Sequence, residues 1–117
     1  MPFRKIEQLY RLSDEDPKAA LSFLSEMGGG PEEKFASAVV LVDCGDTLKD
    51  HAAVSQGVGI FEDIIQKAEP NSELFYNLAN GLEIRARLCH GPVSPIAGQA
   101  FEDRFQARVQ FGKIMRD

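Results

Sequence analysis

Hydrophobic residues recur at intervals of three and four along nearly the whole chain, and this spacing favours a helical fold. In residues 3–12, one face of an amphipathic helix would carry Ile6, Leu9, Tyr10 and Leu12. No segment alternates hydrophobic and polar residues over the length of a strand, and the β-branched stretch 38–42 lies inside a longer helical pattern. The sequence therefore predicts an all-α chain of antiparallel helix pairs joined by short turns.

Capping and helix-breaking residues divide this pattern into about six helices. We expect them at residues 3–12, 17–27, 31–51, 53–68, 73–88 and 99–115. Asp16 suits an N-cap, and Pro17 suits the first helical turn, where its missing N–H is not needed. The glycine run 28–30 is expected to end the second helix. Ser72 is expected to cap the fifth, and residues 89–98, which contain Gly and Pro, are expected to form a loop.

The composition excludes several classes of protein. The chain has 117 residues, enough for one compact domain or a short repeat array. With 13 Lys and Arg against 18 Asp and Glu, its net charge is −5, so we do not expect it to bind nucleic acid. No hydrophobic run approaches the ~20 residues of a membrane span, and residues 1–5 lack the features of a signal peptide. Its 2 cysteines exclude a disulfide framework, and we expect a cytoplasmic protein.

A period of 34 residues links the middle of the chain to its second half. The residue pairs brought together by this shift are Leu41 and Phe75, Cys44 and Leu78, Gly45 and Ala79, and Leu48 and Leu82. Helix pairs repeating every 34 residues resemble the tetratricopeptide repeat (TPR) family. Residues 71–82 are similar to the first helix of that repeat, with Phe75 as its large aromatic and Ala79 as its small residue.

The resemblance implies one domain, residues 1–117, in which helix pairs stack as a short TPR-like α–α superhelix. Residues 1–30 would form a degenerate or capping pair, and residues 31–71 a repeat. Residues 72–117 would form a second repeat with an insertion near 89–104. Each pair has two hydrophobic faces, which stacking buries together. The small residues Gly45 and Ala79 would let the helices of a pair approach closely.

Few residues suggest catalysis or metal binding. Cys89 and His90 are adjacent, so their side chains would point apart unless the loop folds back. Neither a CxxC nor an HExxH motif occurs in the sequence. Cys44 lies on the hydrophobic face of its helix and is interpreted as a core residue. The glycines at 28–30 and at 57 and 59 do not follow a strand, so a helix end and a close helix contact explain them better than a phosphate loop. We therefore expect no enzyme activity, no cofactor and no metal.

TPR domains are usually binding scaffolds, and the first helix of each pair lines a concave groove. By resemblance, Val39 and Val42 would line it together with Asp43, Asp46, Asp50, Glu73, Tyr76, Asn77, Asn80, Glu83 and Arg87. Asp43 and Asp46 would repel the carboxylate-terminated peptides that some TPR grooves clamp. An acidic groove instead favours a basic or neutral extended segment of a partner protein, whose backbone the asparagines could bracket.

Two other functions are compatible with the sequence. Repeats with a similar YNLANG stretch precede helical nuclease-like domains in bacterial proteins, so the chain could be the N-terminal regulatory part of a larger effector enzyme. Alternatively, the last helix, with Phe111 and Ile114, lacks a polar capping helix behind it. An uncapped repeat exposes its stacking face, so a homodimer through this helix is the third hypothesis.

Overall fold

A computed structural model describes residues 2–67, 71–88, 102–103, 105–110 and 113, and the described part of the chain is helical apart from short turns. This confirms the predicted all-α class. The helices are α1 (Pro2–Glu15), α2 (Pro17–Phe23), the 3₁₀ helix η1 (Leu24–Glu26), α3 (Pro31–Leu48), α4 (His51–Lys67) and α5 (Ser72–Arg87). Residues 102–103, 105–110 and 113 are helical as well. None of the described helices is long and apolar enough to cross a bilayer.

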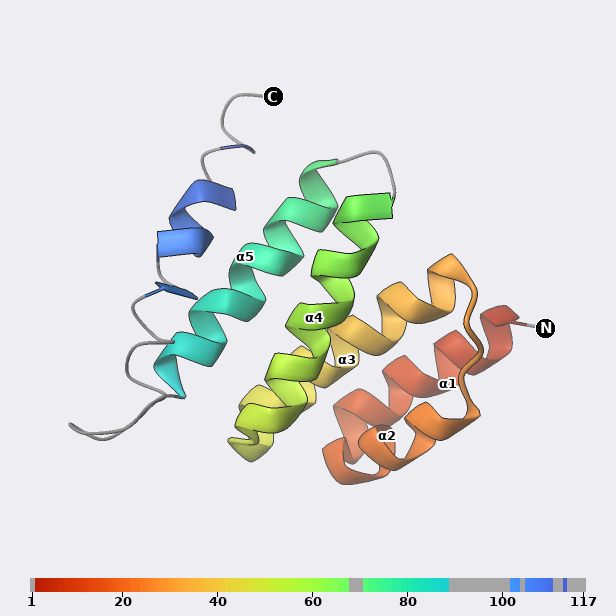
Figure 1. Cartoon of the computed structure of the whole chain (residues 1–117). Helices are drawn as coiled ribbons and strands as arrows, with labels where there is room; N and C mark the ends of the chain where they lie inside the picture. Colours follow the sequence, from red (N-terminus) through yellow and green to blue (C-terminus); the bar gives the residue numbers. More distant parts are fainter. Residues whose placement is uncertain (1, 68–70, 89–101, 104, 111–112, 114–117) are drawn as a thin grey trace.

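The helices follow one another across the molecule in chain order, from α1 and α2 at one end to α5 (Figure 1). The α1 and α2 helices contact each other and α3, whereas α4 packs between α3 and α5. The central helix α3 also contacts α5 directly. Each helix thus shares its buried face with more than one neighbour, and α3 touches all four other α-helices.

Side-chain caps set the starts of the helices. The Asp16 carboxylate accepts a hydrogen bond from the Ala19 N–H at 3.2 Å, which confirms the predicted cap of α2. The cap of α5 is Asn71, whose side-chain oxygen accepts from the Leu74 N–H at 2.9 Å, so the predicted cap at Ser72 is wrong. A side chain at the N-cap reaches the amide three residues on, and Ser72 already lies inside the first turn.

Two predicted helix ends lie too far along the chain. The α2 helix ends at Phe23 and continues as η1, before the glycine run is reached. The α3 helix ends at Leu48 instead of residue 51, because Lys49 adopts a left-handed conformation with φ 55°. In this turn, the Asp50 N–H donates to the Gly45 carbonyl at 2.7 Å, which satisfies one of the last carbonyls of α3.

The core consists of two hydrophobic clusters that share α3. On one side of this helix, Ala36, Val40 and Cys44 are spaced by four residues and pack against α1 and α2. Buried residues of the other helices in this cluster are Leu9 and Ala20. On the other side, Ala38 and Val42 join the buried residues Val54, Val58, Phe61, Leu78, Ala79, Leu82, Ile84 and Ala107. Because α3 is buried on both sides, its sequence is hydrophobic around most of its circumference.

Glycine allows α3 and α4 to cross at close range. A Cβ atom at Gly45 would lie 2.7 Å from Cγ2 of Val54, and one at Gly57 would lie 2.9 Å from the Ala38 carbonyl oxygen. Both glycines are buried. The interpretation as a close helix contact is therefore confirmed for Gly57 but wrong for Gly59, which is exposed and where a Cβ atom would meet nothing within 4 Å. Gly45 plays the part expected of a small residue within a helix pair.

The described residues of the last predicted helix present a different face to the core than the sequence suggested. Asp103 and Ala107 are buried, whereas the hydrophobic Phe105 is 56% exposed. Asp103 is turned inward by a pair of hydrogen bonds from Arg85 of α5, at 2.6 and 2.7 Å. The predicted loop 89–98, the Cys89–His90 pair and Phe101, Phe111 and Ile114 lie outside the described residues.

Candidate functional site

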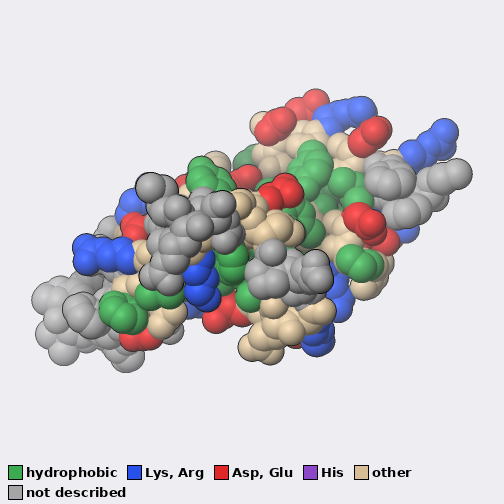
Figure 2. Space-filling model, turned by 90° about the horizontal axis from the view of Figure 1, so that it is seen from above, with side chains coloured by type: hydrophobic (Ala, Val, Ile, Leu, Met, Phe, Trp, Pro, Cys, Tyr) green, Lys and Arg blue, Asp and Glu red, His purple; other side chains and the backbone are tan. Residues whose placement is uncertain are grey.

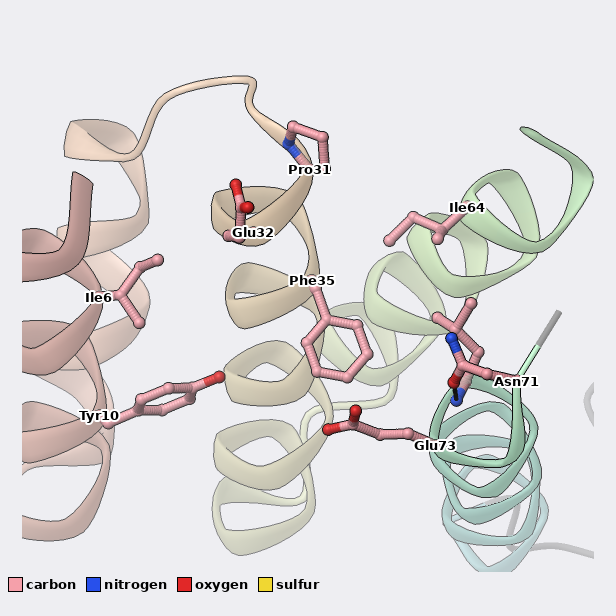
Figure 3. A pocket seen from close by; sticks show the side chains of 9 residues that line it. Ile6, Tyr10, Pro31, Glu32, Phe35, Ile64, Asn71 and Glu73 are labelled. Atoms are coloured by element: carbon pink, nitrogen blue, oxygen red, sulfur yellow. Dashed lines mark hydrogen bonds between the residues drawn. The ribbon is translucent and has the colours of Figure 1, made fainter. Parts of the chain in front are cut away.

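A hollow of about 420 Å³ opens between α1, α3 and α5, beside the C-terminal half of α4, which contributes Ile64. We call it the α1–α3–α5 hollow. Figure 3 shows its side chains projecting from these helices toward a shared space. In the view of Figure 2, acidic side chains border the hydrophobic ones exposed in the middle of the molecule. The residues lining the hollow are Ile6, Tyr10, Pro31, Glu32, Phe35, Ile64, Asn71, Glu73 and Leu74.

The wall of the hollow is mainly hydrophobic and is anchored in the core. The Phe35 ring packs edge-to-face on the Phe61 ring of α4, with centroids 5.6 Å apart and planes at 69°. Leu74 is buried at the start of α5, where the Asn71 cap holds the first turn. Because regular helices carry these residues, the hollow is formed before any ligand arrives.

Two carboxylates and one phenol border this wall. Glu32 and Glu73 are exposed, and Tyr10 is 39% exposed. Tyr10 and Glu73 point toward each other from α1 and α5 (Figure 3). Burial raises the pKa of the Tyr10 hydroxyl, and the negative charges of Glu73 and Asp43 raise it further. The mouth of the hollow therefore carries a negative electrostatic potential.

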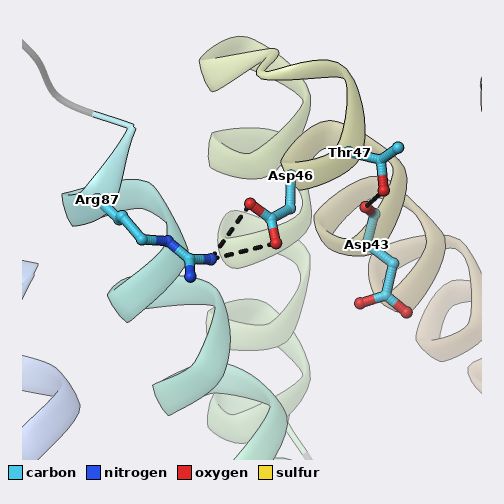
Figure 4. A network of polar contacts seen from close by, with 4 residues as sticks. All are labelled: Asp43, Asp46, Thr47 and Arg87. Carbon is cyan, nitrogen blue, oxygen red and sulfur yellow. Dashed lines mark hydrogen bonds and ion pairs between the residues drawn. The ribbon is translucent and has the colours of Figure 1, made fainter.

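Asp43 contributes to this potential from α3. Partial burial raises the pKa of the Asp43 carboxyl, and repulsion by Asp46 and then Asp14 raises it further. The Thr47 hydroxyl donates to the Asp43 backbone carbonyl at 3.1 Å, while the Asp43 carboxylate points away from Thr47 (Figure 4). Of the predicted groove residues, Asp43 and Glu73 are thus the two whose charges raise the pKa of the Tyr10 hydroxyl.

Asp46 is neutralised by an ion pair further along α3. The Arg87 Nη2 atom of α5 lies 3.2 and 3.1 Å from the two Asp46 carboxylate oxygens (Figure 4). Arg87 also borders a smaller hollow of about 270 Å³, which is lined by Asn80, Glu83, Ile84 and Arg87. The structure therefore divides the predicted groove residues between an acidic end at Glu73 and a charge-paired end at Arg87.

The remaining predicted groove residues have other surroundings. Asp50 caps α4 by accepting from the Ala53 N–H at 3.2 Å, and it lines a separate hollow with residues of α2 and α4. Val42 is buried in the core beneath α4 and α5. The Asn77 side chain donates to the Glu73 carbonyl of its own helix at 2.9 Å, whereas Tyr76 is exposed on α5.

Most of the α1–α3–α5 hollow was missed by reasoning from the sequence. The hydrophobic spacing of residues 3–12 places Ile6 and Tyr10 on one face of a helix and indicates no pocket beside them. Hydrophobic spacing identifies the buried face of a helix, but it does not distinguish a residue packed in the core from one that lines a pocket between helices. An exposed tyrosine next to two acids became recognisable only when α1 was placed beside α3 and α5.

The cysteine of the described residues, Cys44, is in a structural position. Cys44 is buried in the core, and its Sγ lies 3.6 Å from the Ser13 hydroxyl oxygen. Burial is the main cause that raises the pKa of the Cys44 thiol, which disfavours the nucleophilic thiolate. Within the described part of the chain, no group of three or more His, Cys, Asp and Glu residues converges on a point where a metal could bind.

No protein-family profile, curated protein or solved structure shows detectable similarity to this chain. The function is therefore inferred from the molecule itself, that is, from the hydrophobic wall and the acidic border of the α1–α3–α5 hollow.

Proposed function

We propose that the chain is a TPR-like helical-repeat module that binds an extended, basic segment of a partner protein on the surface formed by α1, α3 and α5. The observation that carries this proposal is the α1–α3–α5 hollow, to which three helices far apart in sequence contribute exposed side chains. Hydrophobic pockets with a few polar groups at the border are typical binding sites.

The repeat character of the proposal is supported by the equivalence of residues 34 apart. Gly45 is buried where α3 meets α4, and its counterpart Ala79 is buried in α5. Gly45 lies against α4, the helix that follows its own. In the same way, Ala79 belongs to the core cluster that includes Ala107, which lies in the helical segment after α5. In a TPR-like arrangement α1, α3 and α5 would be the first helices of successive pairs, and these three helices border the hollow together with Ile64 of α4.

A peptide library screened against the purified protein, followed by an NMR titration, tests this function. Enriched peptides should carry an excess of Lys and Arg, and they should shift the backbone amides of Tyr10, Phe35 and Glu73. The hollow between α2 and α4, monitored at Gln56, is the internal control and should not respond. Enrichment of acidic peptides, shifts centred on Gln56, or a screen without binders would contradict the proposal.

A further inference from the structure

We propose that the α1–α3–α5 hollow receives a single lysine or arginine side chain of the partner, with the aliphatic stem on the hydrophobic wall and the cation at Glu73 and Tyr10. This inference rests on the proposed function and specifies its ligand. The occupant is identified from the charge of the lining, its hydrophobic area and its aromatic residues.

The charge of the lining is entirely negative. Among the nine residues that line the hollow, Glu32 and Glu73 are ionisable acids, and no Lys, Arg or His is present among them. Within the described residues, the Lys and Arg side chains that form ion pairs contact Asp63, Asp103 and Asp46 instead. A cation entering the hollow would therefore meet carboxylates that form no ion pair with a base of the described residues.

The negative potential reaches into the hollow from more than one helix. Tyr10, Asp43 and Glu73 belong to α1, α3 and α5, and the two acids both disfavour ionisation of the Tyr10 hydroxyl. A positive charge at this point would relieve the repulsion between the groups. A negatively charged side chain would add to it, so acidic peptides are excluded on electrostatic grounds.

The shape and surface of the wall favour a long side chain over a compact ion. A hydrated metal ion gains little from the hydrophobic surface of Ile6, Ile64 and Leu74. Lysine and arginine carry three or four methylene groups below the charge, and these groups are commonly laid along hydrophobic surface. The aromatic rings of Tyr10 and Phe35 also attract a cation that lies over them. The volume of about 420 Å³ is near the lower end of the ~300–1,000 Å³ found for ligand pockets, which suits a single side chain.

The test uses three blocked peptides of seven residues, each composed of alanine except at the central position. That position holds lysine, its uncharged near-isostere norleucine, or glutamate. Titrations to millimolar concentration are followed by amide chemical shifts on the whole chain. We expect the lysine peptide to shift Tyr10, Phe35 and Leu74, the norleucine peptide to bind about tenfold more weakly, and the glutamate peptide not to bind.

Two variants locate the cation. Glu73→Gln should weaken binding of the lysine peptide several-fold and leave the norleucine peptide unchanged. Glu62→Gln is the matched control, because Glu62 is an exposed acid of α4 that does not line the α1–α3–α5 hollow and is not among the predicted groove residues. It should leave both peptides unchanged. Added salt should weaken the lysine peptide alone, since it screens the charge contact at the exposed mouth.

The outcomes separate this inference from the function on which it rests. Equal binding of the lysine and norleucine peptides, or an equal effect of the two variants, would overturn the cation site. So would a lysine peptide that shifts no amide of the hollow. The binding function would still stand in each case if library peptides shift Tyr10 and Phe35. It falls only if the library gives no binder at the hollow.

Discussion

At the residue scale, two glycines of α4 that are two positions apart have opposite roles. Gly57 is buried against the α3 backbone, whereas a Cβ atom at Gly59 would meet nothing within 4 Å. Glycine in a helix interior is less stable than alanine by roughly 0.5–1 kcal/mol, so it persists at Gly57 because the neighbouring helix leaves no room for a side chain. The same residue type at Gly59 has no such packing reason.

We therefore predict that Gly57→Ala destabilises the protein and that Gly59→Ala stabilises it. The added methyl of Gly57→Ala would lie 2.9 Å from a backbone carbonyl oxygen, which cannot move without shifting α3. We expect a loss of about 1–3 kcal/mol for Gly57→Ala, as for other overpacked cores, and a gain of roughly 0.5–1 kcal/mol for Gly59→Ala. Urea denaturation measures both values. Equal effects of the two variants would show that α3 and α4 are not in close contact at Gly57.

The Asp43 carboxylate predicts a dependence of stability on pH. Because the pKa of Asp43 is raised above its ordinary value of 3.8, the folded chain holds this proton more tightly than the unfolded chain. The contribution of Asp43 to stability therefore falls as pH rises from 3.8 through the raised value, and it stays unfavourable at neutral pH. Asp43→Asn should stabilise the protein at pH 7 by about 0.5 kcal/mol, the scale of exposed charge contacts. The gain should vanish in acid.

Denaturation curves across the acidic range test this prediction. Glu83→Gln, at an exposed acid of α5, controls for the change in net charge and should alter stability less at neutral pH. A loss of stability in Asp43→Asn at pH 7, or a gain that is the same at all pH values, would argue against repulsion among Asp43, Asp46 and Asp14.

At the scale of elements, the helix starts depend on single side chains. The border of the α1–α3–α5 hollow includes Asn71, which caps α5 and thereby orients the first turn with Glu73 and Leu74. Loss of the cap would leave the Leu74 N–H without its side-chain partner. The geometry of the hollow therefore depends on the capping of α5 as well as on helix packing.

Asn71→Ala should lower stability by about 1 kcal/mol, the typical value for an N-cap, whereas Ser72→Ala should change it by less than about 0.5 kcal/mol. Thermal denaturation followed by circular dichroism distinguishes the two residues. The reverse order of effects would mean that α5 begins one residue later, with Ser72 as its cap.

At the scale of the whole molecule, the two arginines of α5 connect it to distant parts of the chain. Arg85 donates two hydrogen bonds to Asp103, which is 1% exposed, and so ties the last described segment to α5. Arg87, two residues on, joins α5 to Asp46 of α3 through an exposed ion pair. Both pairs match arginine with aspartate, but burial makes their energetic consequences different.

Asp103→Asn should therefore destabilise the protein by about 3–5 kcal/mol, because it removes the buried negative charge that the Arg85 guanidinium contacts. Asp46→Asn should cost less than about 1 kcal/mol, as expected for an exposed pair. Replacing both Arg85 and Asp103 by leucine should recover much of the loss. Denaturation together with amide hydrogen exchange of residues 105–110 measures these effects. Similar losses in the two single variants would indicate that the Arg85 pair is open to solvent.

Much of the secondary structure could be predicted because it depends on residues close in sequence. Hydrophobic spacing identified the helices, and Asp16 with Pro17 marked the start of α2 correctly. The errors occurred at the start of α5, where Asn71 and not Ser72 is the cap, and at the ends of α1, α2 and α3. Both ends of a helix depend on local geometry that the sequence pattern does not specify. For the hollow, the sequence pointed to Glu73 through the 34-residue period, but not to Tyr10 or Glu32.

The sequence by itself determined the helical class, the positions of most helices and the small residues at which α3 and α4 cross. These features arise from contacts within about four residues or from the size of a single side chain. Only the tertiary structure decided that Arg87 neutralises Asp46, 41 positions away, and that Asp103 turns inward to Arg85. It also placed Tyr10 at the mouth of an acidic hollow. Contacts through space depend on how the helices pack, and hydrophobic spacing carries no information about which charged side chains then meet.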